Sequence, residues 1–188
     1  MGKKLKKSRN MVLELLKKYY SDSSKAYKIL VIHSECVAEL ALEIEEKHPE
    51  LNLDRKFIYE CAMLHDIGAF ACDAPAIGCT GKEPYIRHGL IGSEILTVEG
   101  LPLHALVCER HTGVGLSLEA IKRRNLPLPH RSMVPVSMEE QVVCFADCFY
   151  SKSGDPSKRK SIDQILRGLT KHGDEQVEKF KRWCEFFL

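Results

Sequence analysis

Length, composition and charge place the chain among globular proteins with a hydrophobic core. It has 188 residues, 44% of them hydrophobic, and a formal net charge of only +2. A chain of this length can bury a substantial core in one domain. The nearly balanced charge does not indicate a dedicated nucleic-acid binder. No apolar run is long enough to span a membrane, so no membrane partner is predicted.

Cysteine usage and the N-terminus together predict a cytoplasmic protein. None of the eight cysteines forms a C-x-x-C pair, and most lie within apolar helical stretches. Free cysteine commonly behaves as a small buried hydrophobe, and persistent thiols are typical of reducing compartments. The basic N-terminal segment is not followed by an uninterrupted apolar core and a cleavage site, so a secretory signal is not predicted.

Hydrophobic periodicity and capping signals predict an all-α, single-domain helical bundle. Capping-box sequences start at Ser137 and Ser161, Asp54 is a predicted N-cap, and Gly68 is a predicted C′ residue. The predicted domain has a core over 24–152 and C-terminal helices within 161–188, separated by a polar linker. A long loop over 69–83 is expected to be functional. We expect helices over about 8–20, 24–47, 54–67, 84–99, 102–111, 117–124 and 137–150.

Histidine and aspartate side chains occupy the apolar faces of five predicted helices. A single histidine on such a face is more often a core residue than a ligand, but buried acids and histidines still require polar partners. Several of them on inward faces would satisfy one another most readily around cations. Nitrogen and carboxylate ligands suit iron, manganese, zinc, nickel or cobalt. Six such residues exceed the need of one open site and indicate two metals: His33, His65, Asp66, His88, His111 and Asp147.

The order of these residues resembles the HD-domain metal-dependent phosphohydrolase superfamily. His65-Asp66-Ile67-Gly68 matches its HDIG signature. The resemblance implies an all-α bundle with His65 and Asp66 as catalytic residues. It also implies two metal groups that share Asp66. One consists of His33, His65, Asp66 and Asp147, and the other of Asp66, His88 and His111.

The activity that the resemblance implies is hydrolysis of a small phosphorylated compound, such as a nucleotide or phosphomonoester. Lys82 and Arg87 are predicted substrate contacts, because they flank the long loop and His88 and arginine can grip a phosphate with two hydrogen bonds. Two surface cations are the other interpretation. Ala69 and Phe70 stand where some relatives carry a phosphate-binding lysine, and no GYP motif is present, which argues against diadenosine tetraphosphate and cyclic-dinucleotide substrates.

Two other functions remain open at this stage. A di-iron oxygenase of the same fold uses the same order of ligands. A non-catalytic nucleotide-sensing module would need no reaction at all, although an intact ligand set favours an enzyme. The sequence does not specify the metal, the substrate or the oligomeric state.

Overall fold

The computed structural model describes residues 3–188, with side chains from Leu5 onward, and confirms the all-α prediction. None of the described helices combines the length and low charge that a membrane span requires. In chain order the α-helices are α1 (Lys3–Lys17), α2 (Lys25–Lys47), α3 (Arg55–Leu64), α4 (His88–Val98), α5 (Pro102–Arg110), α6 (Leu118–Arg123), α7 (Met138–Cys148), α8 (Ile162–Thr170) and α9 (Asp174–Phe187).

The loop predicted over 69–83 has short regular elements of its own. It overlaps the 3-10 turn η2 (Ile67–Ala71) and contains the turn η3 (Pro75–Ile77). On either side of η3, the two-residue strands β1 (Asp73–Ala74) and β2 (Cys79–Thr80) pair in antiparallel register. Strands this short show too little alternation to be seen in a sequence. Further 3-10 turns are η1 (Pro49–Leu51) and η4 (Tyr85–Arg87).

Side-chain caps fix where most of the central helices begin. In each case the cap oxygen accepts a hydrogen bond from a backbone N–H in the first turn, which is worth about 1 kcal/mol. The caps of α2, α3, α6, α7 and α8 are Ser24, Asp54, Ser117, Ser137 and Ser161.

The two predicted capping boxes have different outcomes. The Ser161 box is confirmed, because the Gln164 side-chain oxygen also accepts a hydrogen bond from the Ser161 N–H. The Ser137 box is only half formed. Glu140 instead accepts from the Val136 N–H at 2.9 Å and from the Arg110 guanidinium at 3.0 Å. The charged partner gives the Glu140 carboxylate a stronger hydrogen bond than a backbone N–H does.

Helix α3 is shorter than predicted, and Gly68 has a different role from the one expected. The helix ends at Leu64, His65 is its C-cap, and Gly68 lies in η2 rather than at C′. A Cβ atom on Gly68 would lie 2.3 Å from the His88 carbonyl oxygen and 2.4 Å from the Gly92 nitrogen. The glycine therefore permits close approach of α4, which brings His88 beside Asp66.

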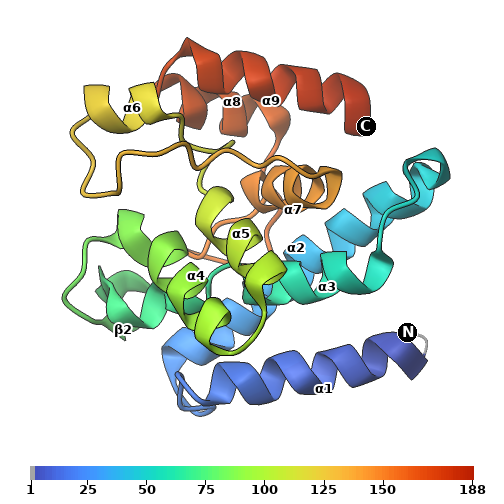
Figure 1. Cartoon of the computed structure of the whole chain (residues 1–188), viewed down its shortest axis with the longest axis vertical. Coiled ribbons are helices and arrows are strands. Elements are labelled where there is room, and N and C mark those ends of the chain that lie inside the picture. Colours follow the sequence, from blue (N-terminus) through green and yellow to red (C-terminus); the bar gives the residue numbers. More distant parts are fainter. Residues whose placement is uncertain (1–2) are drawn as a thin grey trace.

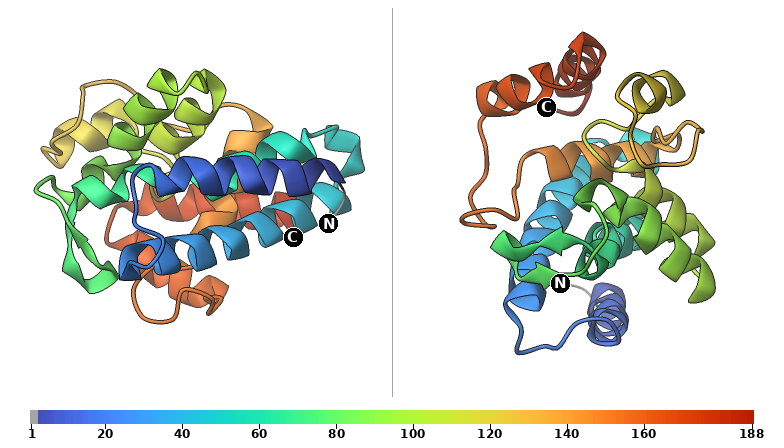
Figure 2. Two further views of the ribbon diagram at one scale, coloured as in Figure 1. Left: turned by 90° about the horizontal axis from the view of Figure 1, so that it is seen from below. Right: turned by 90° about the vertical axis from the view of Figure 1, so that its left-hand side faces the viewer.

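The helices surround the end of α3 on several sides (Figure 1). Helix α2 packs along α3, α1 covers another side of α3, and α7 contacts both α2 and α3. Helices α4 and α5 pair with each other, and α4 also packs on η2. Figure 2, seen from below at left, shows α1 on the outside of the bundle, where it packs on α3. Residues from distant parts of the sequence therefore meet at the C-terminal end of α3.

Aromatic packing attaches the C-terminal helices to this core. The Phe145 ring on α7 has its centroid 5.3 Å from that of Phe180 and 5.2 Å from that of Phe187, and all three side chains are buried. Helix α8 in turn packs against α9. The irregular segment 151–160 swings out from the end of α7 before α8 begins (Figure 2). This segment connects the end of α7 to α8, and the contact with α9 holds α8 against the rest of the fold.

We predict that Gly68→Ala will destabilise the protein, because the added methyl would collide with the backbone of α4. Overpacking of this kind costs about 1–3 kcal/mol, or roughly 2–4 °C of melting temperature per kcal/mol at this size. Thermal unfolding followed by circular dichroism measures the effect. Gly168→Ala is the matched control, because no heavy atom lies within 4 Å of its Cβ position. An unchanged melting temperature for Gly68→Ala would contradict this role of the glycine.

Candidate metal centre

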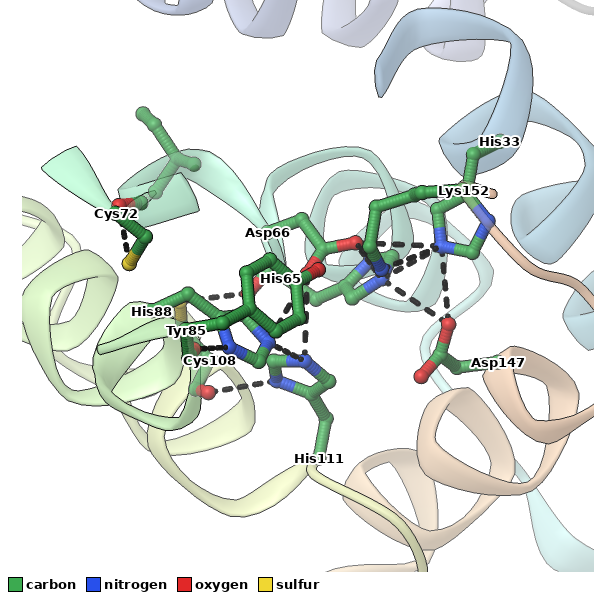
Figure 3. Close-up of polar contacts among 12 residues, drawn as sticks. His33, His65, Asp66, Cys72, Tyr85, His88, Cys108, His111, Asp147 and Lys152 are labelled. Atoms are coloured by element: carbon green, nitrogen blue, oxygen red, sulfur yellow. Dashed lines mark hydrogen bonds and ion pairs between the residues drawn. The ribbon is translucent and has the colours of Figure 1, made fainter. Parts of the chain in front are cut away.

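Asp66 lies at the centre of the site, fully buried between the end of α3 and η2. Its Oδ2 atom is 2.8 Å from His65 Nε2 and 3.2 Å from His33 Nε2. Its Oδ1 atom is 3.2 Å from His88 Nε2 and 3.5 Å from His111 Nε2. One carboxylate thus faces four imidazole rings, two on each oxygen (Figure 3).

All six predicted ligand residues come together in two groups that share Asp66. The first comprises His33, His65, Asp66 and Asp147, and the second comprises Asp66, His88 and His111. Within each group the potential ligand atoms lie within 4.8 Å of one another. Asp147 closes the first group, with Oδ1 3.0 Å from His33 Nε2 and 3.4 Å from His65 Nε2. The pairing agrees with the one that the resemblance implied, while binding of the ions stays a prediction.

Backbone carbonyl groups orient three of the four rings. The Nδ1 atoms of His65, His88 and His111 each lie 2.7 Å from the carbonyl oxygen three residues earlier. A carbonyl oxygen can only accept, so Nδ1 must be the protonated donor. A neutral ring then presents an unprotonated Nε2 to the centre, as a metal ligand requires.

The described residues leave acceptor atoms of the centre without hydrogen-bond donors. His88 Nε2 and His111 Nε2 lie only 3.0 Å apart, and Asp66 Oδ1 has no hydrogen-bond partner among the described residues. Burial disfavours the charged form of His65, but Asp66 and Asp147 outweigh it and raise the pKa of His65 to about 10. Burial instead lowers the pKa of His111 to about 4. A nitrogen and carboxylate donor set of this kind fits divalent transition metals.

Lys152 is a site residue that the sequence analysis missed. Its Nζ atom lies 2.5 Å from Asp66 Oδ2 and 3.3 Å from His33 Nε2. Burial opposes its charge, but Asp66, Tyr85 and Asp147 raise the pKa of the ammonium above its ordinary value. Lys152 belongs to the segment that was predicted to be a polar linker, where a lysine normally indicates solvent exposure. The one available signal is that it closely follows the helix carrying Asp147.

Tyr85 is the second residue that the sequence did not reveal. Its carbonyl accepts the hydrogen bond from His88 Nδ1, and its ring stacks on His88 with centroids 4.6 Å apart and planes 19° apart. The Tyr85 hydroxyl oxygen is buried and has no hydrogen-bond partner within the described chain. Tyr85 therefore both orients His88 and holds an unused donor near the centre.

A cavity of about 510 Å³ adjoins the centre and is lined there by Tyr85, Asp147 and Lys152. Small-molecule sites in proteins commonly measure about 300–1,000 Å³. Neither of the predicted substrate contacts lines this cavity. Lys82 is exposed, and Arg87 forms an ion pair with Glu83 at 3.2 Å. Their role as phosphate partners remains a prediction without support from the cavity.

The fold and the site define an α-helical protein with a buried centre of histidines and aspartates. The chain matches the family described as HD domain over residues 30–151, and it belongs to that family. This confirms the superfamily that the order of ligands suggested.

Two archaeal relatives are similar over most of the chain. A "tRNA (cytidine(56)-2'-O)-methyltransferase" of Thermoplasma volcanium is 33% identical over 93% of this chain. An uncharacterized protein of Methanocaldococcus jannaschii is 30% identical over 90% of this chain and 89% of its own length. The chain spans only 45% of the length of the Thermoplasma protein. No solved structure matches the chain.

We predict about two transition-metal ions per chain, one for each group of ligands. Elemental analysis of protein purified without chelators measures this content. Asp66→Ala should leave less than half of the metal, because Asp66 is common to both groups. His104→Ala is the control, since His104 Nε2 contacts Glu60 Oε2 at 3.3 Å rather than the centre. Unchanged metal in Asp66→Ala would contradict the shared-ligand arrangement.

We also predict that removing the metal will lower the melting temperature by about 10 °C. An ion present at 1,000 times its dissociation constant stabilises the folded state by about 4 kcal/mol, and each kcal/mol is worth roughly 2–4 °C at this size. Lys152 would then be the nearest remaining cation to Asp66. Lys152→Met should therefore destabilise the metal-free protein more than the loaded one. Scanning calorimetry of both proteins with and without metal tests this, and equal losses would contradict it.

Proposed function

We propose that this protein is a metal-dependent hydrolase that cleaves a phosphoester of a small molecule, a nucleotide or a phosphomonoester. The observation that carries the proposal is the shared carboxylate of Asp66, which joins two groups of ligands beside an open cavity. Lys152 supplies a further cation at the same place. A phosphate entering this cavity would meet positive charge on more than one side.

The role of the protein residues at the centre is to fix the spacing and orientation of the predicted metal ligands. Asp66 sets the spacing of the two groups, and the three Nδ1–carbonyl hydrogen bonds prevent the rings from turning away. Divalent ions held there would supply Lewis acidity and lower the pKa of water to about 7, which provides a nucleophile at neutral pH. Asp147 completes the first group and is the ligand that also lines the cavity.

Lys152 and Tyr85 would serve the phosphoryl group directly. A charged donor such as Lys152 stabilises the negative charge that accumulates on phosphoryl oxygens in the transition state. The Tyr85 hydroxyl has no partner to give up and can donate to a second oxygen. Both side chains line the cavity that the substrate would enter.

The relative from Thermoplasma volcanium adds a consideration about the substrate. Its name describes an activity on tRNA, and this chain covers less than half of its length. The name of this relative is not evidence that the present chain catalyses methyl transfer. It does favour nucleotides as the first phosphoesters to test.

The proposed activity is tested by measuring phosphate release from a panel of nucleotides and phosphomonoesters in air and under nitrogen. Hydrolysis needs Lewis acids but no electrons, so activity should survive anaerobic assay and exchange of iron for manganese or cobalt. The di-iron oxygenase would lose its activity under both treatments. Product formation only in the presence of iron and oxygen would show that the protein is an oxygenase rather than a hydrolase. Saturable nucleotide binding without turnover would indicate a nucleotide sensor.

We predict that Lys152→Gln will lower kcat/KM about 100-fold and Tyr85→Phe about 10-fold, with metal content retained. The larger loss reflects removal of a charged donor from the developing transition state. Steady-state kinetics with parallel elemental analysis measure both quantities. Lys47→Gln is the control, because Lys47 is exposed at the far end of α2. A larger loss of kcat/KM in Lys82→Gln or Arg87→Gln would indicate that those residues, rather than Lys152 and Tyr85, contact the phosphate.

A further inference from the structure

The cavity extends from the metal centre to the turn that follows α8. Beyond Tyr85 and Lys152 it passes between η3 on one side and α8 on the other. Apolar side chains contribute to both walls: Ala76 and Ile77 from η3, and Ile165 and Leu169 from α8. A phosphate bound at the centre would leave part of this space unfilled, because 510 Å³ is within the range of about 300–1,000 Å³ that holds whole small molecules.

Gly168 on α8 has no structural reason to be glycine. Four other described glycines have φ outside the left-handed region, and each has a heavy atom within 2.6 Å of its Cβ position: Gly68, Gly81, Gly89 and Gly92. Gly168 shares their ordinary φ, yet no heavy atom lies within 4 Å of its Cβ position. Glycine is also the least favourable helix residue apart from proline. Because Gly168 lines the cavity, its missing side chain leaves room for a ligand.

Two exposed side chains offer hydrogen-bond donors at the same, solvent-facing end of the cavity. The Gln164 carbonyl oxygen accepts from the Ser161 N–H in the capping box, while its amide nitrogen has no partner in the described chain. His172 Nδ1 lies 3.1 Å from a nitrogen of Arg124, which can only donate, so the proton of the neutral ring is on Nε2. Both side chains line the cavity and can donate to ring nitrogens or carbonyl oxygens of a ligand.

We propose that this outer part of the cavity binds the nucleoside portion of a nucleoside phosphate, with the ring packed against α8 at Gly168. The apolar walls suit the faces of a heteroaromatic ring, and the Gln164 amide suits its acceptor-rich edge. The proposal rests on the proposed function, because it takes the metal centre and Lys152 as the phosphate-binding end. It narrows the substrate from phosphomonoesters in general to nucleotides.

Calorimetric titration with two kinds of non-hydrolysable probe tests the assignment on manganese-loaded protein. Methylphosphonate measures the affinity of the phosphate-binding end of the cavity alone. Methylenephosphonate analogues of the four common nucleoside monophosphates report both ends, and their C–P bond prevents turnover. In the wild type, at least one nucleoside probe should bind tenfold or more tightly than methylphosphonate. Gly168→Leu should weaken the nucleoside probe at least tenfold, while methylphosphonate affinity stays within twofold.

Arg167→Leu is the matched control, because the neighbouring residue does not line the cavity and leaves the helix about 100° away. Thermal unfolding should show that Gly168→Leu is folded and no less stable than the wild type. Equal affinities for methylphosphonate and all four nucleoside probes would overturn the assignment, as would unchanged nucleoside affinity in Gly168→Leu. Probe binding as expected without phosphate release would overturn the hydrolase and leave the nucleoside site intact.

Discussion

The buried Asp66 carboxylate is the constraint on which the rest of the structure depends. A charged group without solvent is costly unless other charges compensate it, and four imidazoles, Lys152 and the predicted ions all face this one side chain. The elements that carry these partners must meet at the end of α3. The short helix α3, the tight turn η2 and the close approach of α4 at Gly68 serve that meeting.

The same centre connects the family portion of the chain to residues beyond it. The match to the HD domain covers residues 30–151, whereas Lys152, Lys160 and the lining residues of α8 follow it. The predicted ligand set is therefore contained within the matched region, whereas the wall of the cavity formed by α8 is not.

The predicted ligand residues could be found from sequence because helical periodicity places His33, His65 and Asp147 on apolar faces and because the order of all six residues resembles the HD-domain superfamily. Lys152 and Tyr85 could not, since they lie in irregular or 3-10 segments where periodicity gives no orientation. The sequence indicates Gly68 as a helix terminator. Its packing against α4 is a contact between residues distant in sequence, so local patterns do not predict it. Local patterns thus predict the helices and the metal-type residues. The residues that line the cavity beside the centre are brought there by tertiary contacts, which local patterns do not reveal.

Anomalous X-ray diffraction from crystals of metal-loaded protein tests the central claim most directly. Data collected on both sides of the absorption edge of the bound metal locate each ion without reference to activity. The account predicts two peaks, one in each group of ligands, on opposite oxygens of Asp66. A single peak, or none with the Lys152 ammonium still against Asp66, would contradict a dinuclear centre.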